Sequence, residues 1–284
     1  MKKIKAIIDL TRIDHGLMLG IAVLIGAFIS AKGMPPAIKL FFAFLTAFFL
    51  EAGTFALNDY FDYEVDKRNK RLDRPLVRGD VMPRTALLIY FIASPLGVLF
   101  SIFVNETCFF IAFFNLIIAT LYDVKLKEIK IIGNFYIAFI MAIPFIFGAT
   151  AVSETVPSIV FFFAFLAFSA GVGREIMKDI MDFHGDRAKN IKSFPLYIGE
   201  KKSRIISSLF FIFPSIISFI PFFFKIDLAY FHDFIFLFLL IISDAIFIYT
   251  SYILLTRKNI LACRKLSLLA IFFGLLAFLV GAFV

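Results

Sequence analysis

The sequence predicts an all-α fold: a polytopic bundle of nine transmembrane helices that forms a single membrane-embedded domain over residues 1–284. An extreme apolar composition, a series of long apolar runs and an uneven distribution of charge predict this class. Hydrophobic residues make up 61% of the chain, 42 residues are Phe, and the mean hydropathy is +0.95. Soluble domains contain roughly 45–50% apolar residues, and a compact water-soluble fold cannot bury this much apolar surface.

The apolar runs are long enough to cross a hydrocarbon core of about 30 Å. Residues that end helices, such as Gly33, Pro83 and Pro157, stand near the breaks between runs. The break between the third and fourth runs depends on Asn105–Thr107 alone. The predicted spans are residues 13–31, 37–57, 84–104, 107–122, 131–151, 156–176, 203–223, 230–255 and 265–283.

Lysine and arginine are unevenly distributed between the two sides that nine spans create. The side with the N-terminus carries 26 of the 29 Lys and Arg residues, and the other side carries Lys32, Lys39 and Lys225. A wrong number of spans would place many of the basic residues on both sides of the membrane, so this uneven distribution supports nine spans. Basic segments stay in the cytoplasm. We therefore expect a multi-pass protein of the cell membrane with a cytoplasmic N-terminus and an external C-terminus.

The net charge of +8 is explained by this topology together with anionic substrates, so nucleic acid is not expected as a partner. Cys108 and Cys263 lie far apart and have no ligand spacing, which favours two buried thiols over a disulfide or a zinc site. Asp9, Arg12 and Asp14 interrupt the first apolar stretch. The N-terminal segment is therefore interpreted as a retained membrane helix and not as a cleavable signal.

One acidic pattern, D-x-x-D-x-x-x-D, occurs twice, at residues 59–66 and 179–186. Each copy follows an even-numbered span and has a proline nine residues after its last Asp, at Pro75 and Pro195. The offset of 120 residues predicts a parallel repeat of two four-helix units, with one further helix. Units that are four spans apart have the same orientation, so both motifs are expected in loops on the cytoplasmic face.

The spacing of the three aspartates has a chemical meaning. On a helix, positions i, i+3 and i+7 fall within about 60° of one another, so the three carboxylates share one face and repel. A hard cation relieves the repulsion, and Mg²⁺ bound through a few carboxylates and substrate phosphates matches the pattern. One copy alone would be interpreted as solvated acids, but two copies favour a diphosphate clamp. The predicted metal ligands are Asn58, Asp59, Asp62, Asp66, Asp179, Asp182 and Asp186.

Basic residues accompany both acidic motifs. Arginine offers a bidentate fork to phosphate oxygens, and lysine offers a mobile point charge. The alternative is that these residues only set the topology, which explains others such as Lys201 and Lys202. Arg74 and Arg174 are favoured because each is within about two helical turns of its aspartates. The predicted diphosphate- or substrate-binding residues are Arg12, Lys67, Arg68, Arg74, Lys127, Arg174 and Lys178.

The motifs and their surroundings resemble the UbiA superfamily of intramembrane prenyltransferases. Residues 58–66 and 74–76 are similar to the family's first Asp-rich motif, and residues 174–186 with 194–195 are similar to the second. Residues 121–134 resemble the segment that joins the fourth and fifth spans. The match follows most of the chain in order. Within the family, the resemblance is closest to archaeal enzymes that add a second geranylgeranyl chain to geranylgeranylglyceryl phosphate.

The resemblance implies Mg²⁺-dependent transfer of a geranylgeranyl group from its diphosphate to the sn-2 hydroxyl of geranylgeranylglyceryl phosphate, in archaeal ether-lipid synthesis. The metal and cations stabilise the leaving diphosphate, and aromatic rings stabilise the allylic carbocation. The expected partners are a prenyl diphosphate, a phosphorylated glycerol-ether lipid and membrane lipid, with no indication of oligomeric state. The expected catalytic residues are Asp62, Asp66, Asp182, Asp186 and Tyr122, with Tyr60, Phe61, Tyr63 and Tyr136 as further aromatic candidates.

Two other functions are weighed against this reaction. An acceptor phosphate needs its own cations, which favours glyceryl phosphate over an aromatic acceptor such as 4-hydroxybenzoate or another quinone precursor. Arg12 and Lys127 are candidates for contact with the acceptor or the diphosphate. A cation-coupled transporter would also have repeats and intramembrane acids. Transporter sites usually lie near the bilayer midplane, however, whereas these acidic motifs lie at the membrane edge.

Three further ionisable residues lie near or within the spans. Glu51 is seven residues before Asn58 on the same helical face, so it is expected to support the site or the cavity wall. Asp244 lies inside the eighth span, where a functional role and an interhelical hydrogen bond are equally plausible. His184, beside the second motif, is a candidate proton shuttle, although a simple loop position is favoured.

Overall fold

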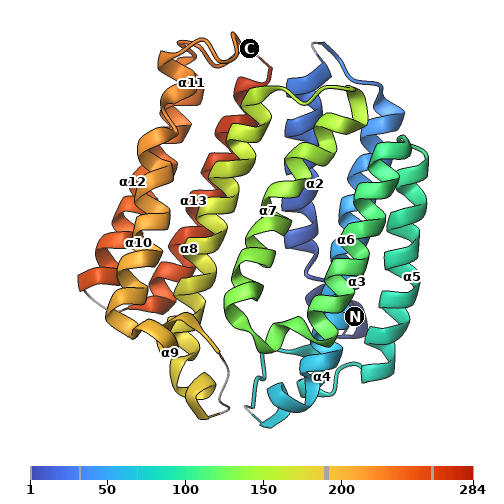
Figure 1. Ribbon diagram of the computed structural model, residues 1–284. Helices are drawn as coiled ribbons and strands as arrows, with labels where there is room; N and C mark the ends of the chain where they lie inside the picture. The colour runs from blue at the N-terminus through green and yellow to red at the C-terminus, as the bar shows by residue number, and fades with distance from the viewer. Residues whose placement is uncertain (1, 32, 69, 189–191, 257–258, 284) are drawn as a thin grey trace.

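The computed structural model describes residues 2–31, 33–68, 70–188, 192–256 and 259–283, with side chains except at residues 2, 128, 184–186 and 188. In this part of the chain, nine helices are long and apolar enough to cross a membrane, as predicted. They run side by side as a bundle (Figure 1). The long helices are α2 (Ile13–Ala31), α3 (Ala37–Arg68), α5 (Pro83–Ile102), α6 (Glu106–Val124), α7 (Lys130–Val152), α8 (Ser158–Ala188), α10 (Glu200–Ile217), α12 (Phe234–Thr256) and α13 (Ile260–Gly281).

Short helices connect or flank the long ones. The N-terminal helix α1 packs on α3 and α4 and was not anticipated from the sequence. The seventh span consists of α10 continued by α11. The short helices are α1 (Lys2–Thr11), α4 (Pro75–Arg78), α9 (Phe194–Ile198), α11 (Ile220–Phe223) and a 3-10 turn at Leu126–Glu128.

The acidic motifs are helical, which corrects the prediction that they lie in loops. Helix α3 contains 32 residues and α8 contains 31, so each is about 45–48 Å long and exceeds a hydrocarbon core of about 30 Å. The apolar pattern ends near residue 57 in α3, but backbone hydrogen bonding continues to Arg68. Each motif therefore occupies the end of a membrane helix that projects beyond the apolar layer.

The helix bounds confirm the parallel repeat. Helix α3 begins at residue 37 and α8 at residue 158, while their ends differ by 120 residues. Within the first unit α2 packs on α3, α3 on α5 and α5 on α6; within the second, α7 packs on α8, α8 on α10 and α10 on α12. Helix α13 stands outside the repeat and packs on α12, α8 and α2.

Helices α2 and α7 form the main contact between the two units, and glycines allow their close approach. A Cβ at Gly26 would overlap the backbone carbonyl of Phe145, and a Cβ at Gly148 would overlap that of Val23. Small residues let membrane helices approach in this way. At the opposite end from the acidic motifs, Phe163 stacks on Phe278 with ring centroids 3.9 Å apart, which joins α8 to α13.

Asp244, an acidic residue within α12, has a hydrogen-bond partner outside its own helix. Ser218 Oγ, just after α10, donates a hydrogen bond of 2.7 Å to Asp244 Oδ2 on α12. Of the two roles considered for Asp244, the structure therefore shows the hydrogen bond between elements. Cys108 and Cys263 are free thiols and are buried, as expected. The two chain ends lie at opposite ends of the bundle, with the N-terminus on the side of α4 and α9 (Figure 1).

Candidate active site

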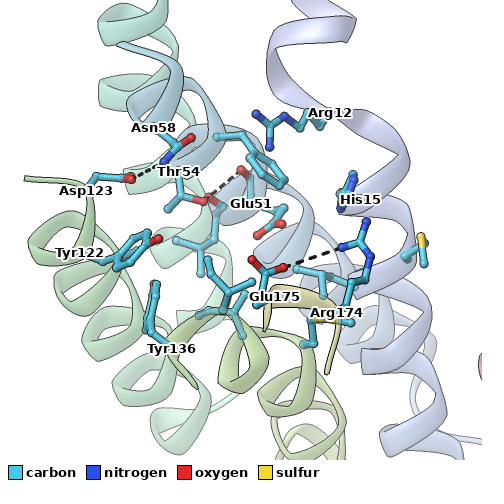
Figure 2. A pocket seen from close by; sticks show the side chains of 18 of the residues that line it. Arg12, His15, Glu51, Thr54, Asn58, Tyr122, Asp123, Tyr136, Arg174 and Glu175 are labelled. Atoms are coloured by element: carbon cyan, nitrogen blue, oxygen red, sulfur yellow. Dashed lines mark hydrogen bonds and ion pairs between the residues drawn. The ribbon is translucent and has the colours of Figure 1, made fainter. Parts of the chain in front are cut away.

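A cavity of about 580 Å³ lies within the bundle and reaches Arg74 and Pro75 at the start of α4. Its lining residues come from both units of the repeat and from α13. The volume is within the roughly 300–1,000 Å³ of ordinary ligand pockets. Figure 2 shows polar side chains of α2, α3, α6, α7 and α8 converging on this space. The acidic and amide residues of the lining are Asp9, Glu51, Asn58, Asp62, Asp73, Asn115, Asp123, Asn134, Glu175, Asp179 and Asp182.

The first acidic motif divides into two sets of side chains. Asn58 and Asp62, one helical turn apart on α3, line the cavity. Asn58 Nδ2 donates a hydrogen bond of 2.8 Å to Asp123 Oδ1 on α6, which fixes the amide with its oxygen available (Figure 2). Asp59 and Asp66 do not line the cavity, so Asp62 is the one aspartate of this motif in the lining.

Asp59 and Asp66 instead hold two arginines at the cavity. Asp59 is 2% exposed, and its Oδ1 accepts hydrogen bonds of 2.9 Å from both Arg12 and Arg74. Arg74 Nε also lies 3.4 Å from Asp66 Oδ2. Both arginines line the cavity. The motif therefore supplies one direct cavity carboxylate and two carboxylates that position phosphate-binding side chains.

Arg12 occupies the break between α1 and α2. Its φ of +45° is in the left-handed region, which is unusual for a residue with a side chain. The guanidinium is 4.1 Å from the ring centroid of Phe55 as well as bonded to Asp59. Strained backbone at a ligand site is maintained by surrounding contacts, and these two contacts hold Arg12 at the cavity.

The second acidic motif faces the first across the cavity. Asp179 and Asp182 both line it, and Asp179 accepts a hydrogen bond of 2.7 Å from Asn134 Nδ2 on α7. At the offset of 120 residues the equivalent of Asp179 is Asp59, which accepts its hydrogen bonds from Arg12 and Arg74 instead. The side chain of the predicted ligand Asp186, like that of His184, lies outside the described residues.

Two lysines from the connection between α6 and α7 balance the facing carboxylates. Lys127 Nζ lies 2.6 Å from Asp62 Oδ1 on the first wall. Lys130 Nζ lies 3.4 Å from Asp182 Oδ2 and 3.8 Å from Asp179 Oδ1 on the second wall. An isolated β-bridge between Ile129 and Lys192 ties this connection to the segment after α8. One short segment therefore carries a cation to each motif.

The remaining predicted cations divide between the cavity and the surface. Arg174 and Lys178 line the cavity on α8, where Lys178 Nζ contacts Glu175 at 2.7 Å. Lys67 and Arg68 are exposed at the end of α3 and do not line the cavity. The reason is helical periodicity, because positions five and six residues beyond Asp62 point away from its face at about 100° per residue.

Among the predicted aromatic residues, Tyr122 and Tyr136 lie at the cavity (Figure 2). Their ring centroids are 4.7 Å apart, and Gly133 leaves the space that the Tyr122 ring occupies. Tyr60, Phe61 and Tyr63 do not line the cavity. Tyr60 and Tyr63 pack beside α1 and α4, and Phe61 is 40% exposed.

Several cavity residues were not assigned a role from the sequence. These residues are Asp123, Asn134, Lys130 and Glu175. The one sequence signal that could have found them is their position, either next to predicted residues or within the segments that resemble the family. Their partners come from other helices, so local spacing could not reveal them. Glu51 lines the cavity as expected, on the same side of α3 as Asn58.

An ion pair forms part of the cavity mouth beyond α3. Arg71 Nε and a terminal guanidinium nitrogen donate hydrogen bonds of 2.9 and 2.8 Å to Asp73. These hydrogen bonds hold the pKa of the Asp73 carboxyl below its usual value. The pair is therefore fully charged at neutral pH and internally balanced.

The oxygen donors of the cavity fit Mg²⁺. Asn58 and Asp62 on one wall and Asp179 and Asp182 on the other present carboxylate and amide oxygens. Among the described residues, no three carboxylate, imidazole or thiol groups converge as a closed metal cluster. Such an open arrangement suits Mg²⁺, which uses one or two carboxylates, water and substrate phosphates.

Comparison with known proteins places the chain in a family. Residues 19–283 match the UbiA prenyltransferase family. A protein of Archaeoglobus fulgidus named digeranylgeranylglyceryl phosphate synthase is 42% identical over 287 residues, covering 99% of this chain and 96% of the relative. A protein of the same name from Thermococcus kodakarensis is 34% identical and covers 99% of both chains.

Solved structures agree with this relationship. One that concerns digeranylgeranylglyceryl phosphate synthase in membranes has a TM-score of 0.74 and 32% identity, over 99% of both chains. A UbiA homolog from Archaeoglobus fulgidus bound to DMAPP and Mg²⁺ has a TM-score of 0.63 over 96% of this chain and 98% of that one, and at 17% identity it supports the fold alone. The chain, a multi-pass membrane enzyme, belongs to the UbiA prenyltransferase family.

Proposed function

We propose that this prenyltransferase transfers the geranylgeranyl group of geranylgeranyl diphosphate to the sn-2 hydroxyl of geranylgeranylglyceryl phosphate. The observation that carries the proposal is one cavity in which carboxylates and cations from both repeat units face each other. Its full-length relatives with 30–42% identity are named digeranylgeranylglyceryl phosphate synthase. The glycerol-ether product of such a reaction is a membrane lipid, which suits an enzyme embedded in the bilayer.

Asn58, Asp62, Asp179 and Asp182 are the described residues that would hold Mg²⁺, with Asp186 as a further proposed ligand. When bound, Mg²⁺ would neutralise the negative charge of the diphosphate leaving group. Arg12 and Arg74 donate to phosphate oxygens from positions held by Asp59. The enzyme thereby stabilises the charge that develops as the allylic C–O bond lengthens.

The remaining steps take place on the apolar side of the phosphates. The C–O bond to diphosphate breaks, the acceptor hydroxyl oxygen bonds to the first prenyl carbon, and its proton leaves with the diphosphate. Tyr122 and Tyr136 present aromatic rings to the cavity, where a carbocation gains cation–π stabilisation. The surrounding helices exclude water that would otherwise capture the cation.

An apolar hollow provides a place for the prenyl chain. It has a volume of about 380 Å³ and lies between α6 and α7, lined by side chains such as Phe110, Phe114 and Phe139. Ile111, Asn115 and Ile143 line both this hollow and the main cavity, so the two spaces adjoin. A long isoprenoid can thus leave the polar site on its apolar side and extend between two helices toward lipid.

The site supports an enzyme over the transporter alternative. Its acidic residues lie on helix ends that project beyond the apolar layer and not at broken helices near the midplane. The large number of lining arginines and lysines favours two phosphorylated substrates over an aromatic acceptor. We further propose that this end of the bundle faces the cytoplasm, because the basic residues gather there.

The reaction is tested with purified protein, radiolabelled geranylgeranyl diphosphate and Mg²⁺. We expect the doubly alkylated product with geranylgeranylglyceryl phosphate and none with 4-hydroxybenzoate. Asp62→Ala and Asp182→Ala should each lower kcat at least about a hundredfold, as expected when a group that stabilises transition-state charge is lost. Glu64→Ala is the matched control, because Glu64 is an exposed carboxylate on α3 outside the cavity lining.

Two results would contradict the proposal. If product formed with the aromatic acceptor and not with geranylgeranylglyceryl phosphate, the proposed acceptor would be wrong, although the protein would still be a prenyltransferase. Full activity in both aspartate variants would show that the facing carboxylates do not act on the diphosphate.

A further inference from the structure

The cations of the cavity differ in how well they are balanced. Arg12 and Arg74 each lie within 3 Å of a carboxylate oxygen of the first motif, and Lys130 lies near both aspartates of the second. Lys127, outside the lining, lies 2.6 Å from Asp62 Oδ1. These cations surround the space between the two motifs. On the opposite side, where α8 approaches α13, two arginines of the lining lack such a partner.

Arg174 on α8 is the first of the two. It is 7% exposed, and its Nε is buried without a hydrogen-bond partner. Its nearest acid is Glu175, at 4.0 Å, but the Glu175 carboxylate already accepts hydrogen bonds of 2.9 and 2.7 Å from Lys178. Figure 2 shows Arg174 beside His15 and Glu175 at the cavity. A buried guanidinium with free donors is costly unless an anion pairs with it.

Arg264 on α13 is the second. It lines the cavity, and among the described residues its side chain has no ion pair within 4 Å. Both arginines line the same cavity, on helices α8 and α13 that pack together. Asp73 attracts Arg264 electrostatically, but that carboxylate is bound by two hydrogen bonds to Arg71. The buried Arg174 and the exposed Arg264 therefore both line the cavity without a carboxylate oxygen within 3 Å among the described residues.

We propose that Arg174 and Arg264 form the subsite that binds the phosphate monoester of the acceptor lipid, apart from the diphosphate between the acidic motifs. This inference rests on the proposed function. A phosphate monoester carries up to two negative charges and accepts bidentate hydrogen bonds from guanidinium groups. It would satisfy the unpartnered Nε of Arg174 and balance the charge of both arginines.

The repeat supports separate subsites. At the position 120 residues before Arg174, the first unit has Thr54, so this buried cation has no counterpart across the pseudo-repeat. Arg264 comes from α13, which stands outside the repeat. The duplicated features therefore clamp one symmetric ligand, the diphosphate, whereas the unduplicated arginines suit a second and different anion.

The apolar lining next to Arg264 suits the lipid part of the acceptor. Leu268 and Ile271 line the cavity four and seven residues further along α13, on the same face of the helix as Arg264. A ligand whose phosphate lies at Arg264 can thus place its hydrocarbon chain along this face. This path lies on the α13 side of the cavity, and the hollow between α6 and α7 remains for the donor chain.

The test compares Arg264→Gln with Lys265→Gln, an adjacent exposed cation on α13 outside the lining. Arg264→Gln should raise KM for geranylgeranylglyceryl phosphate at least about tenfold, because a charge-assisted contact is lost. Its KM for geranylgeranyl diphosphate should stay within about twofold of wild type. Lys265→Gln should change neither constant, and Arg264→Lys should restore part of the acceptor affinity.

A dephosphorylated acceptor identifies the group that is bound. Wild-type enzyme should prefer geranylgeranylglyceryl phosphate to geranylgeranylglycerol, and Arg264→Gln should reduce that preference at least about tenfold. The subsite assignment would be overturned if Arg264→Gln lost activity equally with both acceptors, or if only its KM for geranylgeranyl diphosphate rose. In either case, product formation by the wild-type enzyme would still support the proposed function. Absence of product from either glyceryl acceptor with the wild-type enzyme would overturn both.

Discussion

At the scale of single residues, the aspartates of the first acidic motif have different roles although they belong to one regularly spaced pattern. Asp62 lines the cavity, whereas Asp59 is buried and bonded to Arg12 and Arg74. One oxygen of Asp59, Oδ2, has no hydrogen-bond partner and is buried. Asp59 therefore acts mainly by holding two guanidinium groups in place for phosphate.

Replacement of Asp59 should be more damaging than replacement of Asp80, which is only partly buried. Asp59→Ala leaves two partly buried arginines without their shared acceptor, which costs about 3 kcal/mol, and it should raise KM for the diphosphate. Asp80→Ala removes a pair with Arg78 whose side chains are about one-third exposed, and should cost less than about 1 kcal/mol. Thermal unfolding in detergent and steady-state kinetics measure both effects. Equal shifts for the two variants would contradict the role of Asp59.

At the scale of elements, the two long helices and the α2–α7 contact place the motifs opposite each other. Helices α3 and α8 carry their motifs past the membrane core without a break. The α2–α7 contact then fixes the distance between the repeat units. Because this contact is backbone to backbone at Gly26 and Gly148, it tolerates little change in side-chain size.

Gly148→Ala tests this contact. The added methyl group would overlap the Val23 carbonyl, so we expect a loss of about 1–3 kcal/mol of stability and a parallel loss of activity as the two walls separate. Gly274→Ala is the control, because its Cβ would meet only Ser243 Oγ, at 3.3 Å. Unfolding midpoints and kcat of both variants decide the question. A Gly148→Ala protein as stable and active as the control would show that the units are not held by this approach.

At the scale of the whole molecule, a duplicated four-helix unit and one additional helix produce a bundle with one strongly basic end. The chain ends lie at opposite ends of the bundle, as an odd number of spans requires (Figure 1). The cavity reaches the basic end, where Arg71, Arg74 and Pro75 belong to its lining. The orientation of the protein in the membrane thus decides which compartment supplies the diphosphate.

Cysteine labelling tests the orientation. In a chain with Cys108 and Cys263 replaced by Ser, Leu72→Cys and Leu228→Cys place single thiols at opposite ends, where the native side chains are 67% and 77% exposed. A membrane-impermeant maleimide added to intact cells should label residue 228 and spare residue 72, because basic segments are retained in the cytoplasm. The opposite pattern would place the cavity outside the cell.

The sequence alone determined the features that depend on local pattern. Apolar length and charge parity predicted nine spans, and the repeated spacing predicted the paired motifs that the structure places across one cavity. Helix continuation to Arg68 was missed because polar residues end an apolar run without ending backbone hydrogen bonding. Hydropathy reports the boundary of the lipid, not the boundary of the helix.

Only the tertiary structure decided which charges meet. It divided the first motif between Asp62 at the cavity and Asp59 behind the arginines, and it brought Lys127 to Asp62 from 65 residues away. It also placed Arg264, otherwise one of many basic residues, in the same cavity lining as Arg174. Periodicity defines the face of a helix, but the partner of that face depends on how whole helices pack. The physical reason is that electrostatic pairing depends on distance in space, which the order of residues along the chain does not contain.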